Sequence, residues 1–145
     1  EGMNSRMDGL QAAILNVKLK HLEKWTKLRQ SRANLYTTNL NSCKYIQTPK
    51  VLLNCEHVWH LYVVKCEMRD ELKLYLERLG IPTVVNYKTA LPFLPAYKKL
   101  NHNKDDFPNA YINQNKILSL PLYPELKEEN LNIITDTIYK FYKEL

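Results

Sequence analysis

Glycine is scarce in this sequence of 145 residues, which contains only three. Phosphate-binding loops of the usual kind use closely spaced glycines to let the backbone approach the phosphate, so such a loop is excluded here. The histidines, serines and acidic residues also form no recognisable Ser-His-Asp order or paired-carboxylate motif. We therefore expect no catalytic residue and no self-sufficient active site in this chain.

Cysteine is equally rare. Cys43, Cys55 and Cys66 are odd in number and too widely spaced for a CxxC metal or redox pair. Free thiols in a reducing compartment fit this pattern better than a disulfide framework does. We expect neither a disulfide nor a metal site.

Long apolar runs are missing as well. No run approaches the ~20 residues that a membrane-spanning helix needs, and the first residues lack the basic flank and apolar stretch of a secretory signal. The length and the 45% hydrophobic content suit one domain with one core. These features predict a cytoplasmic protein with no membrane partner.

The formal net charge of +6 would attract anionic ligands. However, the lysines are scattered along the whole chain, and no RNP-like, KH or zinc-finger pattern accompanies them. Nucleic acid is therefore not expected as the main partner.

Residues 4–40 read as one long helix, because apolar residues recur every three or four positions. Ser5, with Asp8 three positions later, resembles a capping box and predicts a helix start within a residue or two of Ser5. The apolar stripe must be covered by another surface. Its members are Leu10, Ile14, Leu15, Val17, Leu19, Leu22, Trp25 and Leu28.

The remaining chain alternates short strands with helices. Apolar and β-branched runs predict strands over 58–64, 83–87 and 117–120. Helices are expected over 69–79, from a start at 106–108 to about 116, and over 127–145, and Gly80 stands where a left-handed cap would end the first of them. This order fits a helix layer covering one side of a small sheet.

The segment 2–8 is the most informative cluster for binding. Backbone N–H groups at a helix start, the Asn4 amide and the Arg6 guanidinium together suit a phosphate or a carboxylate. The alternative is that Asn4 and Ser5 merely cap the helix while Arg6 is solvated. His57 and His60 are three positions apart in extended chain at the predicted strand, so they would point to opposite faces, which favours packed histidines over a metal site.

Residues 2–15, Gly-Met-Asn-Ser-Arg-Met-Asp-Gly-Leu-Gln-Ala-Ala-Ile-Leu, resemble the G-x-N-x-R-M-D-x-L-Q-A-A-I-L signature of the DegT/DnrJ/EryC1/StrS aminotransferases. That motif is long and specific. Further similar segments follow in the family's order, at 60–63, 80–83, 90–97, 106–108 and 118–126. The resemblance spans essentially the whole chain, but only about the final third of the family's length.

The resemblance implies an α/β fold, the two-layer small domain of a fold-type I transferase that depends on pyridoxal phosphate (PLP). A linking helix over 1–40 would precede a core over 57–145, with about three strands and covering helices. In the family, a large domain upstream of the motif holds the cofactor and the lysine that binds it covalently, so both would be missing here. A start at Glu1 without an initiator Met, directly before the motif, favours truncation.

The family reaction moves an amino group, usually from glutamate, to a keto sugar attached to a nucleoside diphosphate. The resemblance therefore implies a homodimeric enzyme of amino-sugar or cell-surface polysaccharide biosynthesis, including that of lipopolysaccharide. It also implies that Asn4 helps bind the phosphate of the cofactor held by the partner subunit, with Arg6 nearby.

The residues 86–88, Asn-Tyr-Lys, stand where many relatives have His-Tyr-Pro, and 92–94 replace a stretch that contains histidine. The run Ala-Leu-Pro-Phe-Leu at 90–94 is similar to a branch of the family that acts on 3-keto sugars. We expect Asn86, Tyr87 and Phe93 to face the substrate. The alternative is that Tyr87 and Phe93 are core aromatics.

Two other functions stay open. One is a stand-alone module that binds anions or nucleotides and dimerises through its first helix. The other is a regulatory protein, although no helix-turn-helix pattern supports DNA recognition.

Overall fold

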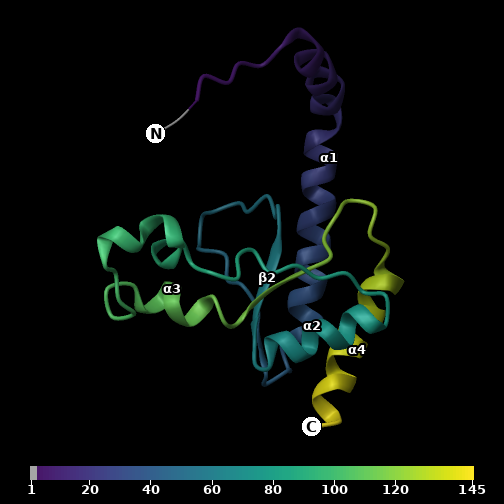
Figure 1. Cartoon of the computed structure of the whole chain (residues 1–145). Helices are drawn as coiled ribbons and strands as arrows, with labels where there is room; N and C mark the ends of the chain where they lie inside the picture. Colours follow the sequence, from purple (N-terminus) through teal and green to yellow (C-terminus); the bar gives the residue numbers. More distant parts are fainter. Residues whose placement is uncertain (1–2) are drawn as a thin grey trace.

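A computed structural model describes residues 3–145. The chain folds into one small sheet surrounded by helices, with a long first helix that projects from the body (Figure 1). The elements are α1 (Gly9–Leu40), β1 (Ile46–Gln47), β2 (Tyr62–Cys66), α2 (Arg69–Arg78), η1 (Leu91–Phe93), η2 (Pro95–Leu100), α3 (Pro108–Asn113), β3 (Ile117–Leu120) and α4 (Glu128–Lys143). η1 and η2 are 3-10 helices.

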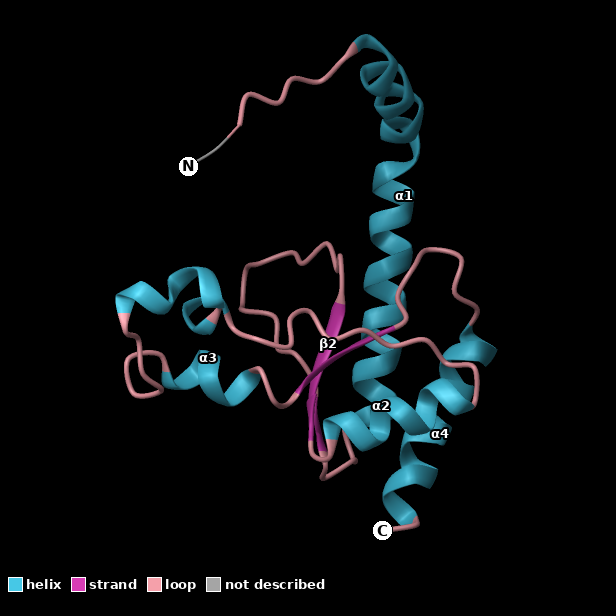
Figure 2. Cartoon of the chain, viewed as in Figure 1, coloured by secondary structure: helices cyan, strands magenta, loops and turns pink. Residues whose placement is uncertain are grey.

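The sheet is antiparallel, with strand order β1-β2-β3. Ile46 pairs with Cys66, and Tyr62 pairs with Leu120. On the other edge of β3, an isolated bridge pairs Val84 with Ser119. Figure 2 shows the sheet between α1, α2 and α4 on one side and the α3 region on the other.

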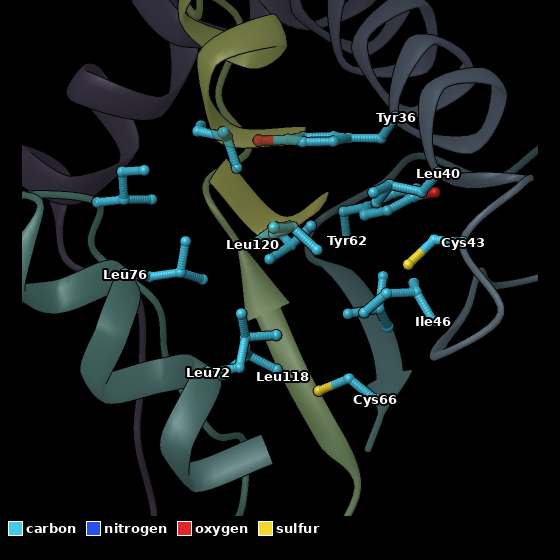
Figure 3. Close-up of a cluster of buried hydrophobic side chains, with 14 of the residues drawn as sticks. Tyr36, Leu40, Cys43, Ile46, Tyr62, Cys66, Leu72, Leu76, Leu118 and Leu120 are labelled. Atoms are coloured by element: carbon cyan, nitrogen blue, oxygen red, sulfur yellow. The ribbon is translucent and has the colours of Figure 1, made fainter. Parts of the chain in front are cut away.

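The core lies on one face of this sheet. Burial alternates along β2, with Tyr62, Val64 and Cys66 buried and the residues between them half-buried, as expected for a strand with one face on the core. Leu72 and Leu76 of α2 pack over this face (Figure 3). The two-layer α/β arrangement predicted from the sequence is therefore confirmed.

α1 has two halves with different surroundings. Ala33, Tyr36 and Leu40 in its second half are buried in the core. The first half stands clear of the body (Figure 1), and its apolar side chains are open to solvent, Leu10 being 73% exposed. The predicted apolar stripe is thus present but uncovered over its first turns.

The predicted start of the first helix was wrong by about one turn. The helix begins at Gly9, and its N-cap is Asp8 rather than Ser5. The Asp8 carboxylate accepts the Gln11 N–H at 2.8 Å, while the Asp8 N–H donates to the Gln11 side chain at 3.3 Å. This reciprocal pair satisfies two N–H groups at once, which explains why the helix starts here.

The strand predicted over 58–64 was wrong at its beginning. Trp59 has a left-handed φ of 51°, which breaks the extended backbone, so β2 starts only at Tyr62. His57 lies in this loop, accepts the Trp59 N–H on Nδ1 at 2.9 Å and packs against the Trp59 ring. A packed, hydrogen-bonded His57 was predicted, although not on a loop.

The strand predicted over 83–87 is reduced to the single bridge at Val84. β1 was not predicted. The predicted helix over 69–79 and strand over 117–120 correspond to α2 and β3. Gly80 has the expected left-handed backbone, with φ of 75°. α3 begins at Pro108 as expected but ends at Asn113, and α4 covers most of the predicted 127–145.

Cys43, Cys55 and Cys66 are all free, the first and last of them buried. Of the helices formed by residues 3–145, none combines the length and the apolar character needed to cross a bilayer.

Candidate functional site

The first cluster of candidate residues lies ahead of α1. Asn4, Ser5 and Arg6 are exposed on a segment without regular secondary structure, and Gly2 of the same motif lies outside the described residues. Ser5 and Arg6 border an open hollow of about 460 Å³. Its other lining residues are Met7, Gln11, Ile14 and Leu15. An amide, a hydroxyl and a guanidinium are thus presented to solvent beside an apolar helix face.

The Asp8 carboxylate limits how an anion could bind here. It already accepts a backbone N–H at the start of α1 and places a negative charge there. A phosphate would be repelled from this helix start. Of the groups that the sequence analysis combined at this helix start, the side chains of Asn4, Ser5 and Arg6 therefore suit an anion better than the backbone N–H groups do.

The second cluster begins just after the Val84 bridge. Asn86 is half-buried, and its peptide bond to Tyr87 is cis. The Tyr87 side chain is 77% exposed. The alternative that Tyr87 is a core aromatic is therefore wrong, and its hydroxyl is open to a ligand.

Phe93 belongs to a region that we call the side lobe, residues 91–113, which contains η1, η2 and α3. Its half-buried ring meets the Tyr111 ring edge-on, with the centroids 5.5 Å apart. Next to it lies an open hollow of about 630 Å³. The hollow is lined by Pro92, Phe93, Leu94, Pro95, Lys98, Asn101 and His102. An aromatic ring and a lysine together offer apolar contact and positive charge.

The side lobe is fixed at its base by partly buried polar contacts. The Ala90 N–H donates to the Gln114 side-chain oxygen at 2.9 Å. The Arg69 guanidinium, only 6% exposed, donates to the carbonyls of Gln114 and Ile117 at 3.2 Å each. These contacts join α2 to the strand β3 and hold both ends of the lobe.

Sequence reasoning missed Arg69, Gln114 and Ser119, which support the second cluster. The Ser119 hydroxyl donates to the Asn86 side-chain oxygen at 3.2 Å. A lone serine inside the apolar run Leu118-Ser119-Leu120 was the available signal, since a polar residue in a buried strand needs a partner.

The two clusters lie at different ends of the molecule. α1 has 32 residues and so is about 48 Å long. Asn4 and Arg6 precede its outer end, whereas Asn86 follows the Val84 bridge at the edge of the sheet, which packs against the second half of α1 through Tyr62 and Tyr36. One copy of the chain therefore does not bring the two clusters together.

A small antiparallel sheet with helices on one face and a long leading helix is the small-domain architecture of fold-type I PLP-dependent transferases. Solved structures of such proteins superpose closely on the chain. DesV of S. venezuelae gives a TM-score of 0.93 with 32% identity, covering 100% of this chain and 39% of that one. An aminotransferase from Brucella abortus gives 0.88 with 34% identity, covering 97% of this chain and 37% of that one.

The chain belongs to the DegT/DnrJ/EryC1/StrS aminotransferase family, whose profile matches residues 1–139. It is 39% identical over 144 residues to the pleiotropic regulatory protein of Geobacillus stearothermophilus, covering 98% of this chain and 39% of that protein. It is 33% identical over 138 residues to the dTDP-3-amino-3,4,6-trideoxy-alpha-D-glucose transaminase of Streptomyces venezuelae, covering 95% of this chain and 36% of that protein. The chain thus spans less than two-fifths of the length of these relatives.

Proposed function

We propose that the protein carrying this chain is a PLP-dependent aminotransferase that moves an amino group from glutamate to a keto sugar linked to a nucleoside diphosphate. The observation that carries this proposal is the family match along nearly the whole chain, which includes both candidate clusters. A relative that matches 95% of the chain is by name a transaminase of a dTDP-linked sugar. The net charge of +6 suits a substrate with a diphosphate.

This chain would form the carboxy-terminal part of that enzyme, with residues 1–40, which include α1, as a linking segment and 57–145 as the core of the small domain. A large domain with the cofactor lysine would make up most of the rest. The exposed apolar side chains on the first half of α1 support this division, because uncovered apolar surface of this kind marks an interface. The large domain and the partner subunit of a homodimer would cover it. The enzyme would act in the cytoplasm, in the biosynthesis of a cell-surface polysaccharide such as lipopolysaccharide.

Asn4 and Arg6 would hold the phosphate of the cofactor bound by the partner subunit. Their exposed amide and guanidinium are chemically suited to a phosphate, as the guanidinium can donate two parallel hydrogen bonds. The cofactor supplies the electron sink that amino transfer needs. The side chains of this chain add orientation and charge.

The cofactor role can be tested by equilibrium binding of PLP to the full-length protein. Asn4→Ala and Arg6→Ala should each weaken PLP binding about tenfold, the loss of one charge-assisted hydrogen bond. Lys18→Ala, which removes an exposed positive charge further along α1, should leave it unchanged. Equal affinities for all of these proteins would exclude the assignment.

Asn86, Tyr87 and Phe93 would contact the sugar nucleotide. The Asn86 amide and the Tyr87 hydroxyl can hydrogen-bond sugar oxygens, while the Phe93 ring offers apolar contact. Asn86→Ala and Tyr87→Phe should raise the KM for the keto sugar or lower kcat in the full-length enzyme. Tyr123→Phe, another exposed tyrosine, is the control. Unchanged sugar kinetics in both site variants would exclude these residues.

The second candidate function is a stand-alone binding or regulatory module. The name of the Geobacillus stearothermophilus relative favours the regulatory role. An antibody raised against this chain can decide between the two functions in a lysate of the source cells. A native polypeptide well over twice 17.2 kDa supports the aminotransferase, whereas one near 17.2 kDa supports the module.

A further inference from the structure

Ser119 is a buried polar residue in the middle of β3. Its neighbours Leu118 and Leu120 point into the core, so the alternation of the strand turns Ser119 to the second face of the sheet. Even there it is only 5% exposed, and Val84 pairs with it along the edge of β3. A hydroxyl in such a position needs a hydrogen-bond partner.

Within residues 3–145, the hydrogen bonds of Ser119 go to one short segment. Its N–H donates to the Val84 carbonyl at 2.8 Å, and its carbonyl accepts the Val84 N–H at 3.2 Å. Its Oγ donates to Asn86 Oδ1 at 3.2 Å. Two backbone bonds therefore hold Val84 in place, and one side-chain bond fixes the Asn86 amide.

The direction of the side-chain bond decides what Asn86 can offer a ligand. An amide carries an oxygen that accepts and an NH₂ group that donates two hydrogen bonds. Because the oxygen is engaged by Ser119, the NH₂ group is left for other partners. Asn86 is only half-buried and precedes the exposed Tyr87, so a ligand can reach it.

We propose that Ser119 is a positioning residue for the sugar substrate: its hydroxyl holds the Asn86 amide so that the NH₂ group faces a sugar oxygen that accepts hydrogen bonds. This rests on the proposed function, in which Asn86 contacts the sugar. With the hydroxyl removed, the amide could rotate and present its oxygen, which cannot bind an acceptor. Ser119 would thus influence sugar affinity without touching the sugar.

The backbone of Ser119 and the base of the side lobe do not depend on this hydroxyl. The two bonds to Val84 use main-chain atoms, and the Ala90 and Arg69 contacts are separate. Ser119→Ala should therefore fold, which circular dichroism can verify. Ser119→Thr keeps the hydroxyl and serves as the conservative variant.

The experiment is a double-mutant cycle in the full-length enzyme with PLP, glutamate and the dTDP- or UDP-linked 3-keto sugar that gives the highest kcat/KM. Ser119→Ala should raise the sugar KM about five-fold, as expected for one neutral hydrogen bond, and leave the half-reaction with glutamate unchanged. Ser119→Thr should stay within about two-fold of the native KM. In an Asn86→Ala background, Ser119→Ala should have no further effect.

Thr135→Val is the control for a merely structural role, because Thr135 is a buried, hydrogen-bonded residue of α4. It should lower stability without moving the sugar KM. Two results would exclude the positioning role and leave the proposed function intact. In the first, Asn86→Ala raises the sugar KM but Ser119→Ala does not. In the second, the effects of the two substitutions on the sugar KM add. If Asn86→Ala leaves the sugar KM unchanged, or if no sugar nucleotide is aminated, the proposed function is wrong. The positioning role of Ser119, which rests on that function, is then excluded as well.

Discussion

The Tyr36 ring of α1 stacks on the Tyr62 ring of β2, with the centroids 5.0 Å apart and the planes at 22° (Figure 3). Both side chains are fully buried. The Tyr36 hydroxyl also donates to the Pro121 carbonyl at 3.0 Å, and the Tyr62 hydroxyl shares a hydrogen bond of 2.8 Å with Thr37. This pair fastens the long helix to the sheet.

The contribution of this pair can be measured by chemical denaturation of the chain. Tyr36→Phe keeps the stack but leaves the Pro121 carbonyl without its donor, so we expect a loss of about 1–2 kcal/mol. Tyr36→Ala also opens a cavity and should lose about 3–5 kcal/mol. The exposed Tyr123→Phe should stay within about 0.5 kcal/mol of the native value. A Tyr36→Ala loss no larger than this control would show that the stack does not support the fold.

Thr83 carries a buried hydroxyl for which the described residues provide no hydrogen-bond partner. Thr83→Val should therefore be neutral or stabilise the chain by up to about 1 kcal/mol, since nothing is lost and a desolvated hydroxyl is removed. Thr135 is a matched control, because its buried hydroxyl both donates to the Asn132 carbonyl and accepts from Asn39. Thr135→Val should destabilise the chain by about 1–2 kcal/mol. The reverse order of the two variants would contradict this account.

Alkaline pH should destabilise the chain. Burial raises the pKa of Cys66 from 9.0 to about 12 and that of Tyr62 from 10.0 to about 12. Both groups are neutral when protonated, so their stabilisation is complete below the unfolded values and is lost as pH rises toward about 12. The free energy of unfolding should begin to fall above about pH 9, by up to ~1.4 kcal/mol per pH unit for each group.

The Cys66 part of this effect can be isolated by denaturation over the same pH range. Cys66→Val removes the thiol and should make the decrease above about pH 9 less steep. Cys55→Ala, at an exposed position, should leave the profile unchanged. Identical profiles for Cys66→Val and the native chain would show that the thiol plays no part.

The exposed face of α1 should make the isolated chain bind apolar dyes and associate. Replacing Leu15, Leu19 and Leu22 by Gln should reduce both effects, because all three side chains are exposed. The free energy of unfolding should change little. By contrast, Leu40→Ala in the buried half should lose about 2–5 kcal/mol. Unchanged dye binding in the triple variant would locate the apolar surface elsewhere.

Periodic segments of the sequence predicted the fold well. α2 and α4 followed from apolar spacing, and Gly80 marked the end of α2 because its φ of 75° suits glycine. The start of α1 was missed because two residues, Ser5 and Asp8, could each act as the cap. Gln11 decides between the two residues, because its side chain completes a capping box with Asp8.

The errors in the strands have a tertiary origin. The run 58–64 has strand composition throughout, yet the left-handed Trp59 and the His57 contact keep its first half out of the sheet. Ile46 and Gln47 form a strand only because Cys66 and Lys65 lie opposite them. Asn86 and Tyr87 were proposed as site residues by resemblance to a family, whereas the hydrogen bond from Ser119 to Asn86 joins residues 33 positions apart.

In the proposed function, this chain is part of an enzyme that aminates a nucleotide-linked keto sugar. The most direct test incubates the full-length protein with PLP, glutamate labelled isotopically at its amino nitrogen and dTDP- or UDP-linked keto sugars, and measures label in the sugar by mass spectrometry. We predict label in one of these sugars and a large loss of it in the Asn86→Ala variant. A full-length protein that binds PLP but transfers no label from glutamate to any of the sugars would contradict the claim.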